Sequence, residues 1–580
     1  IQLGIINYQD SEVIRFANNS REAIATLQGP LTIELNAHLE APVLATRLLL
    51  DLALEKPLPA IEARLGTTRG TNALLTRAGA KMALIVTKGF GDLLKIGEQD
   101  RPDLFTLQIH KYQPLANQVI EIDERMDSSG KPLRVPESES IMEQLRAARA
   151  MGIESLAICL LHSHLNGSHE KTVEAIAREC GFKEISRSSE VAPLIKYVSR
   201  AETTSLDAYL NPILRHYINR VWNQFGGKES CNLRLMTSNG NLVVPDSFRG
   251  RDSILSGPAG GVVGLGEIAK ETGHAKIVGL DMGGTSTDVS RYEDRVGRCY
   301  ESRVAGIRVM TPMMDIETVA AGGGSICTVS QGGRLNVGPS SAGAEPGPAC
   351  YGKGGPLTVT DINLLLGRIA PEQFPFPLDI EAAKARLEEA AQGLTEPALF
   401  SQTEELADGF FDIAVTHMAE AVRTVSTAQG SDVRHMALAG FGGAAGQHLC
   451  RIAETLGMTK IIDHPDSGLL SALGIGIAKV GNLAVRGIYQ PWNGISDLQL
   501  DQHESAVRSI ATEPLTGELR ANESIQQHFE IDLRYQGTES PLTLPLEPKK
   551  NLANRFHKAH MTTFGYKRAD HGLELVALRC

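Results

Sequence analysis

The stretch Asp281-Met282-Gly283-Gly284-Thr285-Ser286-Thr287-Asp288 decides the fold class of this chain. It follows an apolar run, residues 277–280, that has the length and composition of a buried strand. Two adjacent glycines allow a tight turn and let backbone N–H groups approach an anion closely. A strand, a Gly-Gly turn and a second strand, with an aspartate on each side, form the pattern of a phosphate-binding hairpin. An ordinary glycine-rich hairpin is the alternative, whereas a Walker loop would need a Gly-Lys-Ser/Thr sequence entering a helix.

The side chains around this turn suit a bound nucleotide. Thr285, Ser286 and Thr287 place three hydroxyls within reach of phosphate oxygens. Asp281 and Asp288 flank the turn, where their carboxylates are placed to hold Mg²⁺ through water. We therefore predict a phosphate site with Mg²⁺ at this hairpin.

Three other glycine-rich elements point to the same kind of site. Residues 440–446 follow a predicted strand and open a predicted helix, whose N-terminal N–H groups suit a nucleotide; close helix–strand packing is the alternative. Residues 255–261 begin another predicted helix, with Pro258 in its first turn. Residues 66–72 offer small hydroxyls to a substrate or phosphate, or else Thr71 or Asn72 only caps the next helix.

Composition describes an ordinary globular chain and excludes some functions. The 580 residues are 42% hydrophobic and 22% charged, and at about 100–200 residues per domain they predict three or more domains. A net charge of −11 argues against nucleic acid or an anionic membrane as the main partner. No apolar run approaches the roughly 20 residues of a membrane span, and no signal peptide is visible. Eight scattered cysteines without a CxxC pair indicate reduced thiols in the cytosol.

The order of predicted elements indicates an α/β protein. Strand and helix patterns alternate from residue 60 to 190, and residues 311–370 form glycine- and proline-rich loops that we expect to be ordered around a site. A helix is predicted at 404–429, ended by Gly430. Alternation at 529–535 predicts a half-buried strand in a small α+β domain. The predicted domains are residues 1–190, 191–490 and 491–580.

Taken together, these motifs resemble the hydantoinase A/5-oxoprolinase family, which includes subunits of acetone carboxylase. The resemblance covers residues 60–580 and is specific because many motifs occur in the family's order. The matching segments are residues 66–75, 87–105, 159–170, Arg200 with 203–204 and 208–210, 238–240, 256–261, 281–288, Asp315 with 321–325, 440–446, 471–474, 532–537 and 564–566.

One family motif is not found. The family opens with another DxGGTxTD hairpin near its N-terminus, and nothing in residues 1–60 matches it. The chain begins with Ile1, so we expect that an N-terminal piece, and with it one wall of the nucleotide site, is lacking. It ends at Cys580, after the apolar run 573–578, where an A-type half of a longer family member would end.

The resemblance implies a fold and an activity. The fold is that of the actin/sugar-kinase/Hsp70 ATPases, with two α/β lobes, plus the small C-terminal domain. The expected reaction is ATP-dependent hydrolysis of a cyclic amide, 5-oxo-L-proline to L-glutamate, through phosphorylation of the amide carbonyl oxygen. A hydantoinase B-type subunit or half completes the reaction, so an oligomer is expected. N-methylhydantoinase and acetone-carboxylase-type activity are alternatives, and a chaperone-like reactivating ATPase is a remote one.

The resemblance also implies roles for residues. Asp281 and Asp288 are expected to be catalytic and to position Mg²⁺, while Gly442 and Gly443 contact the adenosine of ATP. The phosphate-binding residues are expected to be Gly283, Gly284, Thr285, Ser286 and Thr287. The candidates for a carboxylate-bearing substrate are Thr68, Arg69, Asp100 and Arg101, although a solvated turn is the simpler interpretation of residues 100–103.

Two weaker metal hypotheses remain. Asp315, with Glu317, is a candidate for a divalent ion beside the glycine run 322–324. His162, His164 and His169 have a spacing that could bind a metal, but no Cys or carboxylate cluster completes the site.

Overall fold

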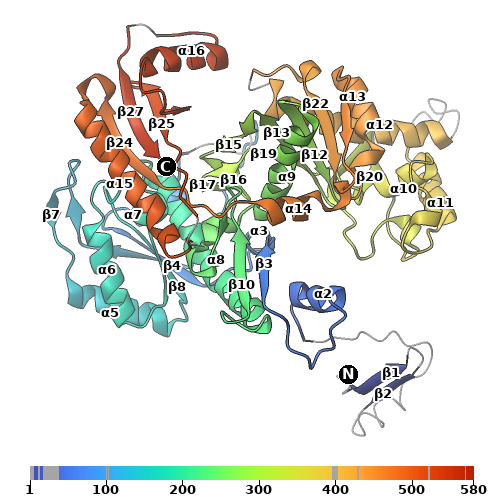
Figure 1. Ribbon diagram of the computed structural model, residues 1–580, viewed down its shortest axis with the longest axis horizontal. Coiled ribbons are helices and arrows are strands. Elements are labelled where there is room, and N and C mark those ends of the chain that lie inside the picture. The colour runs from blue at the N-terminus through green and yellow to red at the C-terminus, as the bar shows by residue number, and fades with distance from the viewer. Residues whose placement is uncertain are drawn as a thin grey trace. The chain divides into compact units, whose positions relative to one another are not determined.

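The computed structural model describes residues 5–10, 13–16, 38–99, 101, 104–394, 403–427, 430–519, 523–568 and 570–580. The chain divides into two compact units. The first unit, residues 1–61 and 219–231, contains the antiparallel pair β1 (Ile5–Asp10) and β2 (Val13–Phe16), and helix α2 (Ala41–Leu49). The second unit, residues 62–218 and 232–580, contains the sheets that position the candidate site (Figure 1).

One sheet of the second unit carries the hairpin at residues 281–288. Its strand order is β14-β13-β12-β22-β23, and β19 also pairs with β13. The strands are β12 (Lys276–Met282), β13 (Thr287–Glu293), β14 (Arg295–Val296), β19 (Ile316–Val319), β22 (Ala437–Phe441) and β23 (Ile461–Asp463). Strands β12, β22 and β23 are parallel, so the turn after β12 and the loop after β22 lie at the same edge of the sheet.

Helices cover both faces of this sheet because side chains of successive strand residues point to opposite faces. On one face, α10 (Val359–Leu365), α12 (Thr403–Val425) and α13 (Leu449–Leu456) pack against Val278 and Leu280. On the other, α9 (Ser256–Thr272) and α14 (Leu470–Ile477) pack against Ile277 and Ala439. The α-helical assignment ends at Val425, but the predicted termination at Gly430 is confirmed. Gly430 has φ +83°, its N–H donates to the Thr427 carbonyl oxygen (3.0 Å), and the Ser431 N–H donates to the Ser426 carbonyl oxygen (3.0 Å), which is the pattern of a helix C-terminus closed by glycine.

A separate, wholly parallel sheet lies in the segment from 82 to 187. Its order is β5-β4-β8-β9, with β4 (Met82–Thr87), β5 (Gln118–Ile122), β8 (Ser155–Cys159) and β9 (Glu184–Arg187). The crossover helices include α5 (Ser138–Ala150) and α6 (Ser168–Glu179), and α8 (Tyr197–Gln224) follows β9. Strands and helices alternate here as the sequence predicted.

The second unit also contains a third sheet and a pair of crossing helices. The sheet contains β3 (Ile61–Leu65), β10 (Cys231–Met236) and β11 (Leu242–Val243), and α3 (Arg69–Leu75) follows β3. Helices α9 and α14 meet through glycines, since a Cβ at Gly474 would lie 1.8 Å from the Gly260 carbonyl oxygen. Any larger residue at this crossing would push the two helices apart.

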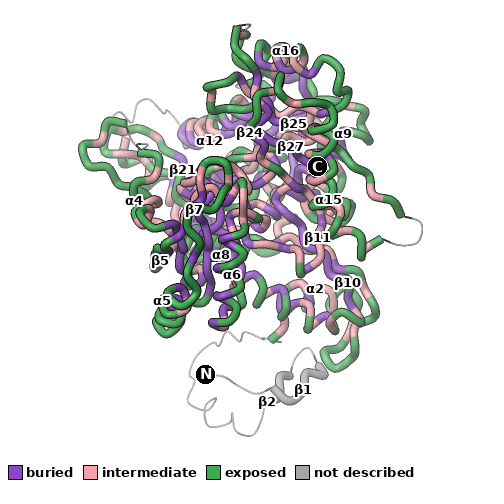
Figure 2. Tube along the Cα trace, turned by 90° about the vertical axis from the view of Figure 1, so that its left-hand side faces the viewer, coloured by how far each residue is buried: buried purple, intermediate pink, exposed green. Residues whose placement is uncertain are grey.

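The C-terminal region is a four-stranded antiparallel sheet with two helices. Its order is β24 (Val485–Pro491), β27 (Leu573–Arg579), β25 (Glu530–Tyr535) and β26 (Leu542–Pro545), and its helices are α15 (Asp497–Thr516) and α16 (Leu552–Phe564). Figure 2 shows buried residues along β25 and β27. The predicted alternation in β25 fails at Asp532, which is buried because it forms an ion pair with buried Arg579 (2.6 Å). The domain boundary at residue 491 stays a prediction.

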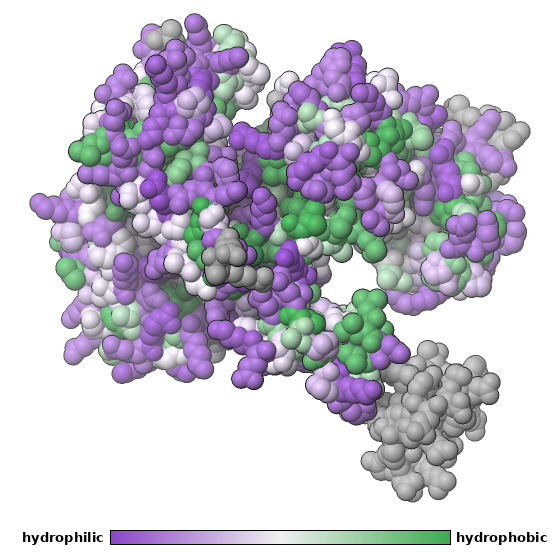
Figure 3. Space-filling view, in the orientation of Figure 1, coloured by the Kyte–Doolittle hydropathy of each residue, from purple (hydrophilic) through white to green (hydrophobic). Residues whose placement is uncertain are grey.

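The remaining regular elements are short hairpins and helices. The paired strands are β6 (Arg125–Met126) with β7 (Pro132–Arg134), β15 (Arg298–Cys299) with β18 (Met313–Met314), β16 (Ser302–Val304) with β17 (Ile307–Val309), and β20 (Ser325–Val329) with β21 (Leu335–Ser341). The helices are α4 (Leu93–Ile96), α7 (Ser188–Val191) and α11 (Ile380–Ala391). Hydrophilic residues cover most of the face seen in Figure 3. Among the helices described, none is long and apolar enough to cross a bilayer.

Candidate active site

The predicted phosphate hairpin is present and its turn is open. Asp281 pairs directly across the two strands with Asp288, which leaves residues 283–286 as the turn. Gly283 N–H donates to the Ser286 carbonyl oxygen (3.1 Å) and closes it. Gly283, Gly284 and Thr285 are exposed, and a Cβ added at Gly284 would meet no atom within 4 Å. The backbone of the turn is therefore accessible to a ligand.

A second glycine run, residues 322–324, packs against the turn and is hydrogen-bonded to it. Gly323 and Gly324 donate their N–H groups to the carbonyl oxygens of Gly283 (3.1 Å) and Gly284 (2.6 Å). A Cβ at Gly322 would lie 2.5 Å from the Ser286 nitrogen, so only glycine permits this approach. The run explains why the glycine-rich segment 311–370 contains ordered loops beside the hairpin rather than a linker.

The two carboxylates are partly buried and face each other across the strands. Asp281 Oδ2 accepts a hydrogen bond from Ser471 Oγ of α14 (3.1 Å), and Asp288 Oδ1 accepts one from Thr318 Oγ1 of β19 (2.5 Å). Burial raises the pKa of Asp281, although the Ser471 hydrogen bond opposes the shift. Burial raises the pKa of Asp288 to about 6, with a further contribution from the charge of Asp281. A cation between them would relieve both effects.

These residues fit Mg²⁺ bound together with phosphate. Mg²⁺ is bound through one or two carboxylates plus substrate phosphates and water rather than by an all-protein cage. In the described part of the chain, no three His, Cys, Asp or Glu side chains form a metal-binding group. The Asp281–Asp288 pair would supply the carboxylates, and the exposed turn leaves the backbone N–H groups of Gly284 and Thr285 accessible to a phosphate.

The glycine loop after β22, residues 442–444 (the Gly442 loop), lies against the hairpin and forms a second side of the candidate site. Gly442 has φ +82°, and a Cβ there would lie 2.4 Å from Asp281 Oδ1 and 2.7 Å from the Met282 carbonyl oxygen. Ala444 N–H donates to that same carbonyl (3.1 Å), which fixes the loop against the hairpin. Gly443 is exposed, and a Cβ added at this position would meet no atom within 4 Å. The loop does not open directly into a helix, because a 3₁₀ turn at Ala445–Gln447 precedes α13.

The hydroxyls predicted to bind phosphate are placed differently from one another. Thr285 is exposed on the turn and Ser286 is half-buried. Thr287 is fully buried, and its hydroxyl donates to the Ala321 carbonyl oxygen. Thr287 therefore fastens the hairpin to the segment behind it, which differs from its predicted contact with the cofactor.

The predicted substrate residues lie in two different places. Thr68 is the exposed N-cap residue of α3, beside Gly257 at the start of α9. The Arg69 guanidinium lies 4.2 Å from the centroid of the Tyr217 ring. Arg101 lines a shallow surface groove near α4, and Asp100 lies outside the described residues. A common substrate site for the four residues stays a prediction.

Helix α14 connects the hairpin with the loop at residues 66–72. Its first turn supplies Ser471 to Asp281, and farther along a Cβ at Gly66 would lie 2.9 Å from Ile475. Ser256 Oγ at the start of α9 donates to the Thr67 carbonyl oxygen (2.9 Å). In the sequence, the segment containing Ser471 stood out only as a family motif, and Thr318 was missed because it has no local signal.

The weaker metal candidates have other roles in the structure. Asp315 N–H donates to the Gly297 carbonyl oxygen (3.0 Å), and burial with the charge of Asp315 raises the pKa of Glu317. His169 Nδ1 lies 2.6 Å from a Glu124 oxygen, and His164 Nδ1 lies 2.9 Å from the Arg200 guanidinium. The side chains of His169 and His164 are held by protein partners, so they add nothing to the case for a metal. A divalent ion at Asp315 and Glu317 stays a prediction.

Comparison with known proteins identifies similar chains. A family model described as hydantoinase/oxoprolinase matches residues 200–483, and one described as the hydantoinase/oxoprolinase N-terminal region matches residues 21–181. A 5-oxoprolinase of Saccharomyces cerevisiae is 37% identical over 594 residues, which is 93% of this chain and 46% of that protein. The chain thus spans about half the length of the curated 5-oxoprolinases that it matches.

Solved structures agree with these matches. The alpha subunit of caprolactamase from Pseudomonas jessenii is 30% identical, and the crystal structure of that ATP-dependent caprolactamase has a TM-score of 0.78, covering 89% of this chain and 77% of the other. Nucleotide-free acetone carboxylase has a TM-score of 0.67 at 21% identity, covering 89% and 78%, and shows the shared fold. The prediction of an α/β, actin/sugar-kinase/Hsp70-like ATPase fold is confirmed. The chain belongs to the hydantoinase/oxoprolinase family.

Proposed function

We propose that this chain is the ATP-using part of an enzyme that hydrolyses a cyclic amide, with 5-oxo-L-proline and L-glutamate as substrate and product. The observation that carries the proposal is the pair Asp281 and Asp288 on either side of an exposed Gly-Gly turn, with the Gly442 loop beside it. Similarity to 5-oxoprolinases supports the choice of substrate.

The chemistry explains why ATP is needed. An unstrained amide is a poor electrophile, and phosphorylation of its carbonyl oxygen activates the carbon. The amide oxygen attacks the γ-phosphorus and ADP leaves; water then adds to the carbon and the ring C–N bond breaks. A second water hydrolyses the resulting acyl phosphate, so one ATP and two waters give the amino acid, ADP and phosphate.

The chain's residues contribute position and charge. Asp281 and Asp288 would hold Mg²⁺, and the ion would neutralise phosphate charge during phosphoryl transfer. The turn donates backbone hydrogen bonds to phosphate oxygens from Gly284 and Thr285, while the Gly283 N–H closes the hairpin. Ser471 orients the Asp281 carboxylate and Thr318 orients the Asp288 carboxylate, each through one hydrogen bond.

A larger lactam is the second candidate substrate. The chain aligns with 77% of the caprolactamase alpha subunit but with only 46% of the yeast 5-oxoprolinase. Similarity to the alpha subunit over most of its length supports caprolactam as the alternative substrate. A hydantoin, or a ketone with bicarbonate, follows as a further alternative.

A cytoplasmic location belongs to the same proposal and is supported by eight cysteines that are free thiols.

A substrate panel tests the proposal. ADP release is measured for the chain with a B-type partner, and separately without one, in the presence of 5-oxo-L-proline, caprolactam, a hydantoin, or acetone with bicarbonate. We expect 5-oxo-L-proline to stimulate ADP release most strongly, and glutamate to form only with the partner. Stimulation by another compound alone would replace the substrate, and ATP hydrolysis indifferent to all of them would refute the proposal.

A further inference from the structure

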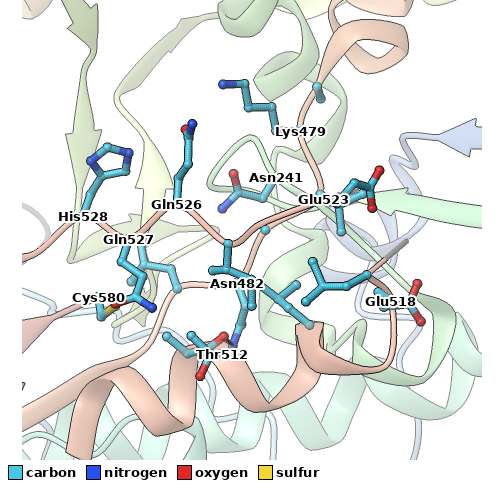
Figure 4. A pocket seen from close by; sticks show the side chains of 18 of the residues that line it. Asn241, Lys479, Asn482, Thr512, Glu518, Glu523, Gln526, Gln527, His528 and Cys580 are labelled. Carbon is cyan, nitrogen blue, oxygen red and sulfur yellow. Dashed lines mark hydrogen bonds between the residues drawn. The ribbon is translucent and has the colours of Figure 1, made fainter. Parts of the chain in front are cut away.

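A large cavity lies in the second unit, away from the phosphate hairpin. Its volume is about 740 Å³, within the roughly 300–1,000 Å³ typical of ligand pockets. Its walls come from β3 and β10, from the segment 477–483 that follows α14, and from α15 with residues 523–530. Figure 4 shows Glu518 and Glu523 on one side of it and Gln526 and His528 on another. None of the lining residues belongs to the hairpin or to the Gly442 loop.

The carboxylates that line this cavity are already paired within the protein. Glu62 pairs with Arg64 (2.7 Å), Glu518 with Arg234 (2.5 Å) and Glu530 with Arg295 (3.5 Å). Glu523 also has an interaction partner. The negative charge of the lining is therefore largely neutralised before any ligand arrives.

The cationic side chains of the lining are not all paired. Arg298 and Lys479 are exposed, and neither forms an ion pair with any residue that the structure describes. Arg234 is only 8% exposed, and Glu518 contacts its Nη2. Its other terminal nitrogen, Nη1, has no hydrogen-bond partner in the described chain. The uncompensated charge of the lining is thus positive, and a buried cation with an unused donor favours a nearby anion.

Neutral polar groups complete the lining. Asn241, Gln526 and Gln527 present amides that both donate and accept hydrogen bonds. Such groups suit hydroxyl, amine or amide substituents better than a hydrocarbon chain. The Leu242 N–H donates to the Lys479 carbonyl oxygen (2.9 Å), so Asn241 and Lys479 come from adjoining backbone segments of the cavity wall (Figure 4).

We propose that this cavity binds a small polar anion carrying a carboxylate or a phosphate group, at a site separate from the phosphate hairpin. Arg298 and Lys479 attract and hold the anionic group, and the amides bind the polar remainder of the molecule. The inference goes beyond the proposed function and does not depend on which ring the enzyme opens.

Calorimetric titration of the full chain tests the site, with inorganic phosphate and L-glutamate as separate probes. We expect at least one probe to bind, and the double variant Arg298→Gln with Lys479→Gln to bind it about ten-fold more weakly, because charge-assisted hydrogen bonds are lost. Lys183→Gln is the matched control: this exposed lysine has no ion pair in the described chain and lies outside the cavity. It should bind like the parent chain.

Two controls keep the outcomes distinct. Arg298 and Lys479 are exposed and unpaired in the described chain, so we expect the double variant to fold like the parent chain. Its circular dichroism and thermal unfolding check this directly. Gly442→Ala disturbs the hairpin, so it weakens any phosphate binding there and should leave binding to the cavity unchanged. Binding lost in Gly442→Ala but kept in the double variant would place the anion at the hairpin and overturn the proposal. Failure of both probes to bind at millimolar concentration would overturn it as well.

Discussion

Replacing Gly442 by alanine isolates the contact between the two glycine elements. The new Cβ would lie 2.4 Å from Asp281 Oδ1. Carbon and oxygen atoms in contact stay more than 3 Å apart, so the carboxylate must move by about 1 Å. The φ of +82° at residue 442 adds strain, because a left-handed conformation costs a non-glycine residue about 1–2 kcal/mol.

We expect this variant to hydrolyse ATP about 100-fold more slowly, since a displacement of about 1 Å in a reacting constellation costs that much. This corresponds to about 2.7 kcal/mol of activation free energy. The assay is ADP release at saturating MgATP, with thermal unfolding measured alongside to separate activity from stability. Gly446→Ala is the matched control in the same loop, because a Cβ there meets no atom within 4 Å. Gly442→Ala activity within about three-fold of the control would refute the reasoning, since that factor is well under 1 kcal/mol.

Three further changes test neighbouring parts of the account. Ser471→Ala removes the hydrogen bond that opposes the raised pKa of Asp281, so the pKa of Asp281 should rise further. The acid limb of the ATPase pH profile should therefore move to higher pH, and kcat should fall about ten-fold. An unmoved acid limb would show that Ser471 does not act through Asp281. Asp288→Asn should raise the Mg²⁺ concentration for half-maximal ATP hydrolysis about ten-fold or more, because one of two carboxylates is lost; an unchanged Mg²⁺ titration would exclude it as a metal-binding residue. Asp532→Ala leaves Arg579 buried without its partner and should lower the free energy of unfolding by about 3–5 kcal/mol in urea titrations; a loss under about 1 kcal/mol would contradict the buried ion pair.

The hairpin could be predicted from sequence because its signal is local. A buried strand, two glycines and flanking aspartates fall within a dozen residues, and the register that pairs Asp281 with Asp288 follows from the short turn. The parallel sheet of residues 82–187 was predictable for the same reason, since alternating apolar strands and amphipathic helices carry their own periodicity.

The residues that orient the carboxylates could not be predicted this way. Ser471 lies 190 residues from Asp281, and Thr318 lies 30 residues from Asp288. Ser471 lies in a family motif that does not reveal its partner, and Thr318 has no local signal; each contact exists only because separate elements pack on the same sheet. Likewise, the reason for glycine at position 442 is the proximity of Asp281, which a strand-and-loop pattern does not reveal.

Local rules failed where tertiary contacts overrode them. Asp532 was expected to face solvent by alternation, but its ion pair with Arg579 places it in the core. Thr287 was expected to face phosphate, but its hydroxyl is used by the Ala321 carbonyl oxygen. In both cases a polar side chain is buried because it has a partner distant in the sequence.

The measurement that tests the central claim most directly is the ratio of products formed by the chain with a B-type partner. ADP and L-glutamate are quantified in the same reaction, with 5-oxo-L-proline present and then omitted. The account predicts one glutamate for each substrate-dependent ADP, and loss of both products together in Asp281→Asn. ADP release that 5-oxo-L-proline leaves unchanged, or glutamate formed without ATP, would contradict it.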